Sequence, residues 1–319
     1  MSESVDCKLL IPGLSQLLRS METEYLSAHF PALNRFFSRA RKQSSQTAYF
    51  SLVSQALTND SSERYPYAAL QARYHGLTDG YWVRAVPIEL LPDRDRLLMQ
   101  KTLTDELTPP VIERVSSLLM DYFRDDIAEV HFHDDAWLIR MHTDSAICFY
   151  SWIDALGNNI DRFMPTGNDQ KFWHALINEV QMLLYQDEPV SAVLNTLWFE
   201  AGGSLEELTD NESRTRMVLM TDNDLLKVVA SERGLTVVQK ADQLDFGNGL
   251  LMVDDKLLRH PGAVDGLAKI EDYQQLFQTL MSAMAKGQFK RIQLYTLDGY
   301  CFELSRLDLF KFWKRRLSI

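Results

Sequence analysis

Short apolar runs alternate with stretches of helical periodicity along most of this chain. Compact apolar runs predict strands, and apolar residues that recur at intervals of three and four predict helices. The predicted strands are Lys8–Ile11, Tyr81–Leu90, Arg96–Met99, Glu129–His133, Trp137–His142, Met217–Met220, Leu250–Val253, Arg291–Thr296 and Tyr300–Leu304. The predicted helices include Pro31–Lys42, Thr47–Leu57, Tyr67–Tyr74, Asp222–Arg233, Val264–Lys286 and a closing helix over Leu307–Arg316.

This alternation predicts an α/β fold class. Strands that alternate with helices are typical of a layered, mainly parallel sheet flanked by helices. Hairpin patterns are concentrated in residues 80–165, so we predict that this segment forms an inserted α+β subdomain. Residues 1–79 and 166–319 then form the α/β core domain.

The stretch from Asp161 to Leu205 joins a turn, an amphipathic helix and a strand. The predicted buried side of the helix consists of Phe172, Leu176, Val180, Leu183 and Leu184. A polar stripe on another side consists of His174, Asn178, Gln181 and Tyr185. The strand that follows contains Asn195 and Trp198 and ends at Gly202-Gly203, where backbone amides can approach a ligand closely. This arrangement is typical of a binding site at the carboxyl end of a sheet strand.

The composition is that of a globular protein with an acidic surface. Hydrophobic residues make up 46% and charged residues 24% of the 319 residues, which excludes a disordered chain. A net charge of −11 repels phosphate backbones, so we expect no nucleic-acid partner. The C-terminal cations Lys311, Lys314, Arg315 and Arg316 are interleaved with aromatic residues, which favours an amphipathic closing helix over a nucleic-acid interface.

Nothing in the pattern indicates secretion or a membrane. Cys7, Cys148 and Cys301 lack the paired spacing of a disulfide framework or a metal-binding knuckle. The N-terminal residues lack the basic start and the long apolar segment of a secretory signal. No apolar run approaches the roughly 18 residues of a transmembrane helix. We therefore expect a cytoplasmic protein with no membrane partner.

A histidine-rich hairpin is the densest group of metal-capable side chains. His131 and His133 point to the same face of one predicted strand, and His142 lies on the partner strand. Two imidazoles and a carboxylate suit zinc, manganese or iron. The same alternation also fits a solvent-facing hairpin with an Asp134-Asp135 turn, and we favour that interpretation.

Motifs for nucleophilic catalysis and for nucleotide binding are absent. The chain contains no GxSxG, GxGxxG or GxxxxGK[ST] sequence. Ser15 follows the first predicted strand, but no His lies near it in the sequence to activate its hydroxyl. We therefore assign no catalytic residue.

Arginines and aspartates alternate in the segment Pro92–Arg96. An extended backbone places Asp93 and Arg94 on opposite sides of this segment, and Arg84 lies on the preceding predicted strand. Arginines beside a pocket bind a phosphate or carboxylate through paired hydrogen bonds. The alternative is a turn whose charges pair with one another at the surface.

Three longer segments resemble a known bacterial family. They read YWVRAVPIELLPDRDRLLMQ, DRFMPTGNDQKFWHALINEVQMLLYQDEPV and NTLWFEAGGSL, with further likeness at LLIPGL and FPALNRFFSRARK. Together they resemble the regulatory protein E family of the rpf (regulation of pathogenicity factors) cluster. That family is similar, at a distance, to the archaeal type of cofactor-independent phosphoglycerate mutase, within the alkaline phosphatase superfamily. The resemblance implies a layered α/β fold with an inserted subdomain.

The chain departs from the mutase pattern at the metal ligands. The resemblance implies two divalent metals, with an Asp-Gly directly after the first strand and a late DExxHDG segment. Here the first strand runs into Ile11-Pro12-Gly13-Leu14, which has no carboxylate. The nearest late segment, DDKLLRHPGAVDG, has its acidic and histidine residues in a different order, at Asp254, Asp255, His260 and Asp265. A two-metal site needs several ligands around shared centres, so we predict no cofactor and no catalysis.

Two hypotheses of different classes follow. In the first, the protein is a regulatory pseudoenzyme that binds a small anionic ligand or a protein partner. Its predicted ligand-binding residues are Arg84, Asp93, Arg94, Asn178, Gln181, Asn195, Trp198, Gly202 and Gly203. The alternative is a metal-dependent phosphoglycerate mutase or phosphohydrolase with a rearranged manganese or zinc site. A scaffold whose polar stripe only faces solvent is a third possibility.

Overall fold

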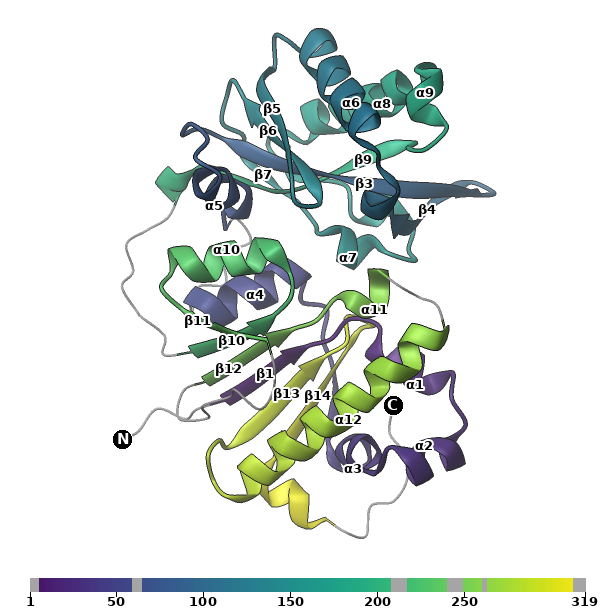
Figure 1. Cartoon of the computed structure of the whole chain (residues 1–319), viewed down its shortest axis with the longest axis vertical. Helices are drawn as coiled ribbons and strands as arrows, with labels where there is room; N and C mark the ends of the chain where they lie inside the picture. The colour runs from purple at the N-terminus through teal and green to yellow at the C-terminus, as the bar shows by residue number, and fades with distance from the viewer. Residues whose placement is uncertain (1–5, 59–64, 208–216, 240–248, 260–262, 312–319) are drawn as a thin grey trace. The chain divides into compact units, whose positions relative to one another are not determined.

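The chain forms two compact units (Figure 1). The computed structural model describes residues 6–58, 65–207, 217–239, 249–259 and 263–311. The first unit joins residues 1–47 to residues 214–319, and the second consists of residues 48–213. The first unit is therefore built from both ends of the chain, and the second is inserted between them in the sequence.

A seven-stranded sheet forms the centre of the first unit, in the order β11-β10-β12-β1-β13-β14-β2. The strands from β11 to β13 are parallel to one another, and β14 and β2 are antiparallel additions. Their bounds are β1 Asp6–Leu10, β2 Arg41–Ser44, β10 Met217–Thr221, β11 Thr236–Val238, β12 Gly249–Val253, β13 Arg291–Tyr295 and β14 Tyr300–Ser305. The predicted fold class, a layered α/β fold with a mainly parallel sheet flanked by helices, is confirmed.

Four helices bury one face of this sheet: α1 Leu14–Arg19, α2 Thr23–His29, α3 Pro31–Arg39 and α12 Ala263–Ala285. The aromatic rings of Phe36 on α3 and Phe277 on α12 meet edge to face, with their centroids 4.7 Å apart. Each fully buried side chain of this size contributes roughly 1.5–3 kcal/mol. α10 Asp224–Glu232 packs against β10 and β11, and α11 Lys256–Arg259 and the 3-10 helix η5 Arg306–Phe310 complete the described helices.

The second unit contains a five-stranded antiparallel sheet around a long central strand, β3. The bounds are β3 Trp82–Asp93, β4 Arg96–Thr102, β5 Ile127–His133, β6 Ala136–Met141 and β9 Thr196–Gly203. One edge of β3 pairs with β9. The other edge pairs with β6 along the first part of β3 and with β4 along its last part. A separate two-stranded ribbon joins β7 Ile147–Cys148 to β8 Thr166–Gly167.

Helices lie on both faces of this antiparallel sheet (Figure 1). α6 Pro109–Tyr122 and α8 Gln170–Gln186 bury one face, and α5 Tyr67–Tyr74 covers part of the other with three alanines against Trp82 and Leu138. The remaining helical segments are α4 Tyr49–Thr58, α7 Trp152–Ala155, α9 Glu188–Ser191, η1 Thr104–Glu106, η2 Ile160–Arg162 and η3 Leu205–Glu207. None of the helices within the described ranges combines the length and apolarity needed to cross a membrane.

The inserted unit is larger than the segment 80–165 expected from the sequence. It also takes in α4 and α5 before that segment and α8 and β9 after it. The reason is that β9 pairs with β3, and the apolar side of α8 packs against the same sheet. The helix and strand of Asp161–Leu205 therefore lie in the antiparallel unit and not beside the parallel sheet.

Local patterns predicted both hairpins. β5 and β6 turn at Asp134-Asp135, and β13 and β14 form the second hairpin, as expected. On α8, Trp173 and Ile177 are buried where Phe172 and Leu183 were predicted. Arg41–Ser44 is an edge strand paired with β14 and not the end of a helix, and the described part of the closing helix is the short η5.

Candidate functional site

A pocket of about 310 Å³ opens in the second unit between α8, the first residues of β9, β4 and the segment around η2. Its apolar side is formed by Leu90, Ile177, Leu197 and the nearly buried indole of Trp198. Its polar side is formed by Asp161, His174, Asn178, Gln181 and Thr196. A mostly apolar concavity with a few placed polar groups is the usual form of a small-molecule site, and this volume lies at the small end of that range.

Two amide side chains of the predicted polar stripe line this pocket together. Asn178 and Gln181 lie one helical turn apart on α8, and His174 lies one turn before Asn178. Neither amide side chain has a hydrogen-bond partner among the residues that the structure describes. Each amide offers both a donor and an acceptor, so the pair can recognise a neutral polar group in either sense.

His174 and Trp198 are held in place by backbone carbonyls. The Nε2 atom of His174 lies 2.9 Å from the carbonyl oxygen of Pro165, so this nitrogen carries the proton and Nδ1 remains an acceptor. The Nε1–H of Trp198 donates to the carbonyl oxygen of Tyr150 at 2.9 Å. Both rings are therefore fixed before a ligand arrives, which lowers the entropy cost of binding.

Asn195 supports the pocket from behind. Its Oδ1 accepts from the backbone N–H of Leu90 at 3.2 Å, and its Nδ2 donates to the Leu90 carbonyl at 3.0 Å. These two bonds hold the far half of β3 beside the start of β9. Asn195 therefore positions Leu90, which lines the pocket, and its own side-chain amide is already hydrogen-bonded.

No arginine or lysine is part of this pocket's lining. Asp161 is the one charged lining residue in the described part of the chain, and it is exposed. An anionic ligand there would meet a carboxylate and no counter-charge. The pocket therefore suits a neutral ligand with an apolar body better than the anionic ligand expected from the sequence.

Arg84 lies at the centre of a buried ion network and is 2% exposed. Its guanidinium donates to Gln71 Oε1 at 2.6 Å, to Asp135 Oδ1 at 2.8 Å and to Glu200 Oε1 at 3.3 Å. Burial lowers the pKa of Arg84, but the carboxylates of Asp135 and Glu200 more than offset this, so the pKa is raised. The charge of Arg84 is already neutralised by the protein's own groups.

Burial in this network disfavours the charged form of Glu200. Burial raises the pKa of Glu200, and the charge of Arg84 reverses only part of that effect. The second carboxylate oxygen accepts the backbone N–H of Trp152 at 3.0 Å, which ties the strand β9 to α7. A buried carboxylate held this way joins three elements of one unit.

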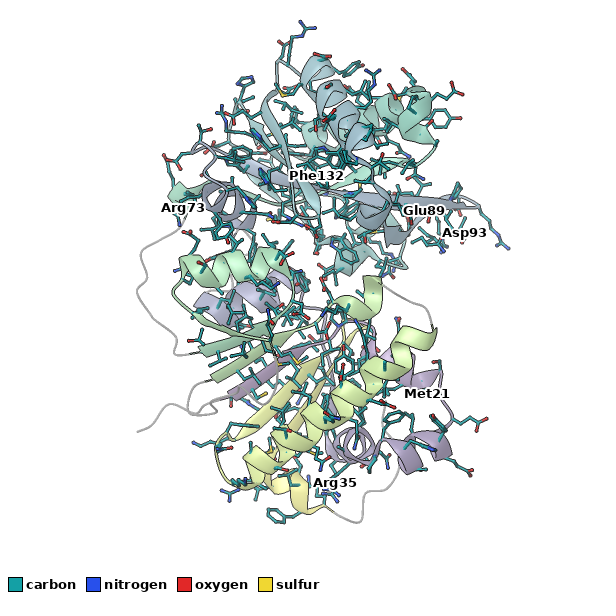
Figure 2. All side chains as sticks on the ribbon, in the orientation of Figure 1. Met21, Arg35, Arg73, Glu89, Asp93 and Phe132 are labelled. Atoms are coloured by element: carbon teal, nitrogen blue, oxygen red, sulfur yellow. The ribbon has the colours of Figure 1, made fainter. Side chains whose placement is uncertain are left out.

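Asp93 and Arg94 lie at the tip of the β3–β4 hairpin, and Figure 2 labels Asp93 at the far end of β3. Both are exposed, and Arg94 has a φ of 55°, the left-handed conformation of a turn residue. Neither lines the pocket beside α8. The structure therefore brings together Asn178, Gln181 and Trp198, and places Arg84, Asp93 and Arg94 elsewhere.

The paired glycines serve packing inside the unit. A Cβ atom at Gly202 would lie 2.5 Å from Phe149 Cε2 and 2.9 Å from Tyr81 Oη, closer than real atoms approach. Gly203 pairs with Trp82 across the ladder to β3. Two aromatic rings of the protein thus fill the space beside Gly202 that a ligand was expected to use.

The histidine hairpin divides its side chains among different neighbours. His131 Nε2 lies 3.2 Å from Glu129 Oε2, His142 Nε2 lies 3.3 Å from the carbonyl oxygen of Arg124, and His133 stacks on His75 with centroids 4.0 Å apart. Burial lowers the pKa of His133, and the neighbouring His75 lowers it further. These contacts are those of a surface hairpin and not of converging metal ligands.

The carboxyl edge of the parallel sheet carries a second group of polar side chains. The contacts there are Ser15 Oγ to Asp298 Oδ2 at 2.6 Å, Asn223 Nδ2 to Asp255 Oδ2 at 3.0 Å, and Tyr273 Oη to Asp254 Oδ2 at 3.0 Å. Ser15 is fully buried beneath this edge. These carboxylates are each held by a donor of the protein.

The donors at this edge do not fit the two-metal centre that the resemblance implies. Nowhere in the described part of the chain do three His, Cys, Asp or Glu side chains gather in an arrangement that can hold a metal ion. Residue His260 and the side chain of Asp265 lie outside the described residues.

Comparison with known proteins yields fold likeness alone. No protein-family model and no curated protein matches the chain. A cofactor-independent phosphoglycerate mutase from Thermoplasma acidophilum DSM 1728 is 12% identical with a TM-score of 0.43, covering 94% of this chain and 89% of that chain. The PH0037 protein from Pyrococcus horikoshii is 11% identical with a TM-score of 0.44, covering 96% and 88%.

The first of these structures belongs by name to the mutase class that the sequence resemblance implies. With TM-scores of 0.43 and 0.44, these two structures say nothing about the activity, substrate or metal of this protein. The resemblance to the rpf regulatory family stays a prediction. We therefore infer function from the side chains that each unit brings together.

Sequence patterns missed several polar residues of the second unit. Gln71 and Glu200 were not singled out, and Asp135 was named only as a residue of the hairpin turn, although all three partner Arg84. A charged residue inside an otherwise apolar strand, as Glu200 is within TLWFEAGG, was the available signal. Asp154 gave no such signal, because its burial arises from the packing of α7.

Removing the cation of the buried network should destabilise the second unit strongly. We expect Arg84→Met to lower the free energy of unfolding by about 3–5 kcal/mol, because it leaves two carboxylates buried without their counter-charge. Urea denaturation measures the change. Arg140→Met is the matched control: Arg140 pairs with Glu129 at a partly exposed position, where a loss of about 0–1 kcal/mol is typical. Equal losses in the two variants would contradict the assigned role.

Asp154 should make stability depend on pH. Burial is the largest cause that raises the pKa of Asp154 from 3.8 to about 7, and its Oδ2 has no partner among the described residues. A raised pKa in the folded state means that the folded protein holds this proton more tightly. Its contribution is complete below about pH 4 and is lost as the pH rises through 7, with an upper limit of about 4 kcal/mol.

We therefore expect Asp154→Asn to gain stability relative to the native chain as the pH rises from 5 to 8. Urea unfolding at several pH values measures the difference. Oδ1 can still accept the backbone N–H of Tyr49, which lies 2.9 Å from it in the native chain. Asp95→Asn, at an exposed turn, is the control for removing a carboxylate. A pH-independent difference for Asp154→Asn would show that this carboxyl is not the group responsible.

Proposed function

We propose that this protein is a non-catalytic ligand-binding protein, of the regulatory kind that the sequence resemblance implies. We propose further that the pocket beside α8 and β9 takes a small neutral molecule with an apolar body. The observation that carries the proposal is the pair of free amides, Asn178 and Gln181, facing an apolar wall that includes Trp198. A ligand with one hydrogen-bonding edge and one apolar face complements both sides.

The pocket's chemistry favours recognition over reaction. Amides bind and orient, but they neither take nor give protons at neutral pH. His174 is the one imidazole among the described residues that line the pocket, and its Nε2 is committed to the carbonyl of Pro165. No lining nucleophile lies within hydrogen-bond contact of it among the described residues. These features support binding without turnover.

The side-chain amides of Asn178 and Gln181 should determine the affinity of the pocket for its ligand. A fragment library of neutral aromatic amides, screened by quenching of tryptophan fluorescence, should give ligands through Trp198. We expect Asn178→Ala and Gln181→Ala each to weaken such a ligand by about tenfold, the loss of one hydrogen bond of ordinary strength. Gln186→Ala removes an amide from the exposed end of the same helix and should leave the affinity unchanged. Ligands that bind all three variants equally would place the site elsewhere.

A metal-dependent phosphomutase remains the second candidate. The carboxylates of Asp254, Asp255 and Asp298 at the carboxyl ends of parallel strands are the feature that favours it, since ligands of open α/β sheets bind at that edge. Against it stand the occupied carboxylates described above and the missing carboxylate after β1. Metal content separates the two candidates directly.

The purified protein should carry no stoichiometric manganese or zinc. We expect elemental analysis to find less than about one-tenth of a metal ion per chain, and thermal unfolding to be unchanged by Mn²⁺, Zn²⁺ or a chelator, because ligand binding to the folded state would raise the midpoint. His260→Ala and His131→Ala are the variants for the two candidate ligand sets. A stoichiometric metal lost in either variant would establish the alternative.

A further inference from the structure

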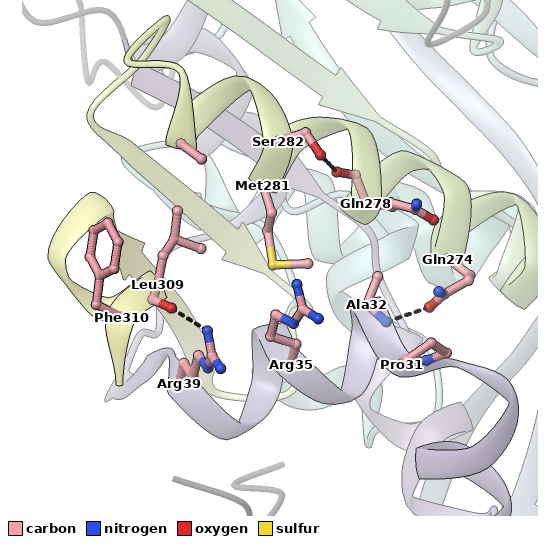
Figure 3. Close-up of a pocket in the computed structure, with 11 residues that line it drawn as sticks. Pro31, Ala32, Arg35, Arg39, Gln274, Gln278, Met281, Ser282, Leu309 and Phe310 are labelled. Carbon is pink, nitrogen blue, oxygen red and sulfur yellow. Dashed lines mark hydrogen bonds between the residues drawn. The ribbon is translucent and has the colours of Figure 1, made fainter. Parts of the chain in front are cut away.

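A second pocket, of about 420 Å³, lies in the first unit between α3, α12 and η5 (Figure 3). Two arginines of α3, Arg35 and Arg39, line it one helical turn apart. The facing wall is α12, which contributes Gln274, Gln278 and Met281, and the end of η5 contributes Leu309 and Phe310. The pocket shares no residue with the one beside α8.

The two arginines have no carboxylate partner among the residues that the structure describes. Neither forms an ion pair within the described part of the chain, in contrast to Arg84, Arg140 and Arg291. No Asp or Glu is among the described residues that line the pocket. Like charges one turn apart on a helix repel each other, so the pair destabilises α3 in the free protein.

The sequence around α3 is locally basic in an acidic chain. Residues 25–59 contain no Asp or Glu but include Arg35, Arg39, Arg41 and Lys42, although the chain has a net charge of −11. The carboxylate of Asp308 on η5 is 1% exposed and contacts Ser305, Lys311 and Arg41. Within the described ranges, the charges of Arg35 and Arg39 are therefore not paired with a carboxylate.

The donors are held in position. Arg39 donates from Nη1 to the carbonyl oxygen of Leu309, which fixes one side of its guanidinium and leaves other N–H groups available. Gln274 Oε1 accepts the backbone N–H groups of Ala32 at 2.9 Å and Leu33 at 3.1 Å. That satisfies the first turn of α3 and leaves Nε2 of Gln274 as a further donor in the lining of the pocket (Figure 3).

The surroundings of Arg39 favour binding of a counter-ion. Burial lowers the pKa of Arg39, and the charge of Arg35 lowers it further. Both causes act against the charged form, and an anion between the two guanidiniums would reverse the second. Arginine binds phosphate and carboxylate groups through two parallel hydrogen bonds, which a pair of guanidiniums can supply.

The rest of the pocket is apolar. Ala32, Met281, Leu309 and the ring of Phe310 line it beside the arginines. The ring of Phe310 is 63% exposed and is therefore accessible to a ligand in the pocket. We propose that this pocket binds a small organic anion whose phosphate or carboxylate group lies between Arg35 and Arg39 and whose apolar body lies against Met281 and Phe310.

The test is calorimetric titration of the full chain with phenyl phosphate, which combines the two features. We expect one saturable site, and about a tenfold or greater loss of affinity in Arg35→Gln and in Arg39→Gln, the effect of removing a charged hydrogen-bond donor. Arg94→Gln makes the same change of charge at an exposed hairpin turn and should bind as the native chain does. Higher salt should weaken binding, because part of the attraction is between exposed charges.

Further probes separate the parts of the ligand. Phenol, which lacks the charge, and inorganic phosphate, which lacks the ring, should each bind more weakly than phenyl phosphate. Benzoate in place of phenyl phosphate decides between carboxylate and phosphate as the preferred anion, and tighter binding of either supports the site. Ala285→Leu keeps both arginines but fills the pocket, so it should also weaken binding.

Three results would overturn the inference. These are no saturable binding of either phenyl phosphate or benzoate at millimolar concentration, undiminished binding by a double Arg35→Gln, Arg39→Gln variant, and an equal loss in Arg94→Gln. Circular dichroism of each variant shows that α3 is still folded. Asn178→Ala should leave phenyl phosphate binding intact, so failure here is distinct from failure of the pocket beside α8.

Discussion

The buried guanidinium of Arg84 constrains the second unit more than any other single group. It is 2% exposed, so its hydrogen bonds must come largely from protein groups, and Gln71, Asp135 and Glu200 supply them from α5, the β5–β6 turn and β9. Satisfying one cation in this way fixes the helix, the turn and the strand relative to β3. The pocket beside α8 depends on that arrangement, because β9, which carries Trp198 in its wall, is held in register by its pairing with β3.

The same network explains why the guanidinium of Arg84 plays no part in the proposed binding. A buried arginine with two carboxylates has little capacity left for an outside anion. The pocket beside α8 is left with amides, a fixed imidazole and one exposed carboxylate, which suit neutral polar ligands. The two pockets therefore differ in kind: free amides line one, and the unpaired arginines Arg35 and Arg39 line the other.

Local sequence patterns predicted the structure correctly where residues that are close in the chain are also close in space. The Asp134-Asp135 turn and the hairpin around Asp298 follow from alternation and turn chemistry alone, and both formed as expected. The stripe on α8 was also visible, because residues three and four apart share a helix face. Three of its members, His174, Asn178 and Gln181, line one pocket for that reason. The edge strand at Arg41 carried no such signal, since its partner β14 lies far along the chain.

The sequence by itself determined the α/β class, the hairpins, the acidic surface and the absence of a carboxylate after β1 at Ile11-Pro12-Gly13. Only the tertiary structure decided which side chains meet. It paired Arg84 with Glu200 across 116 positions and left Arg35 without a carboxylate among the described residues, although the two arginines look alike in sequence. The physical reason is that burial and long-range strand pairing set the environment of a charge, and periodicity contains no information about either.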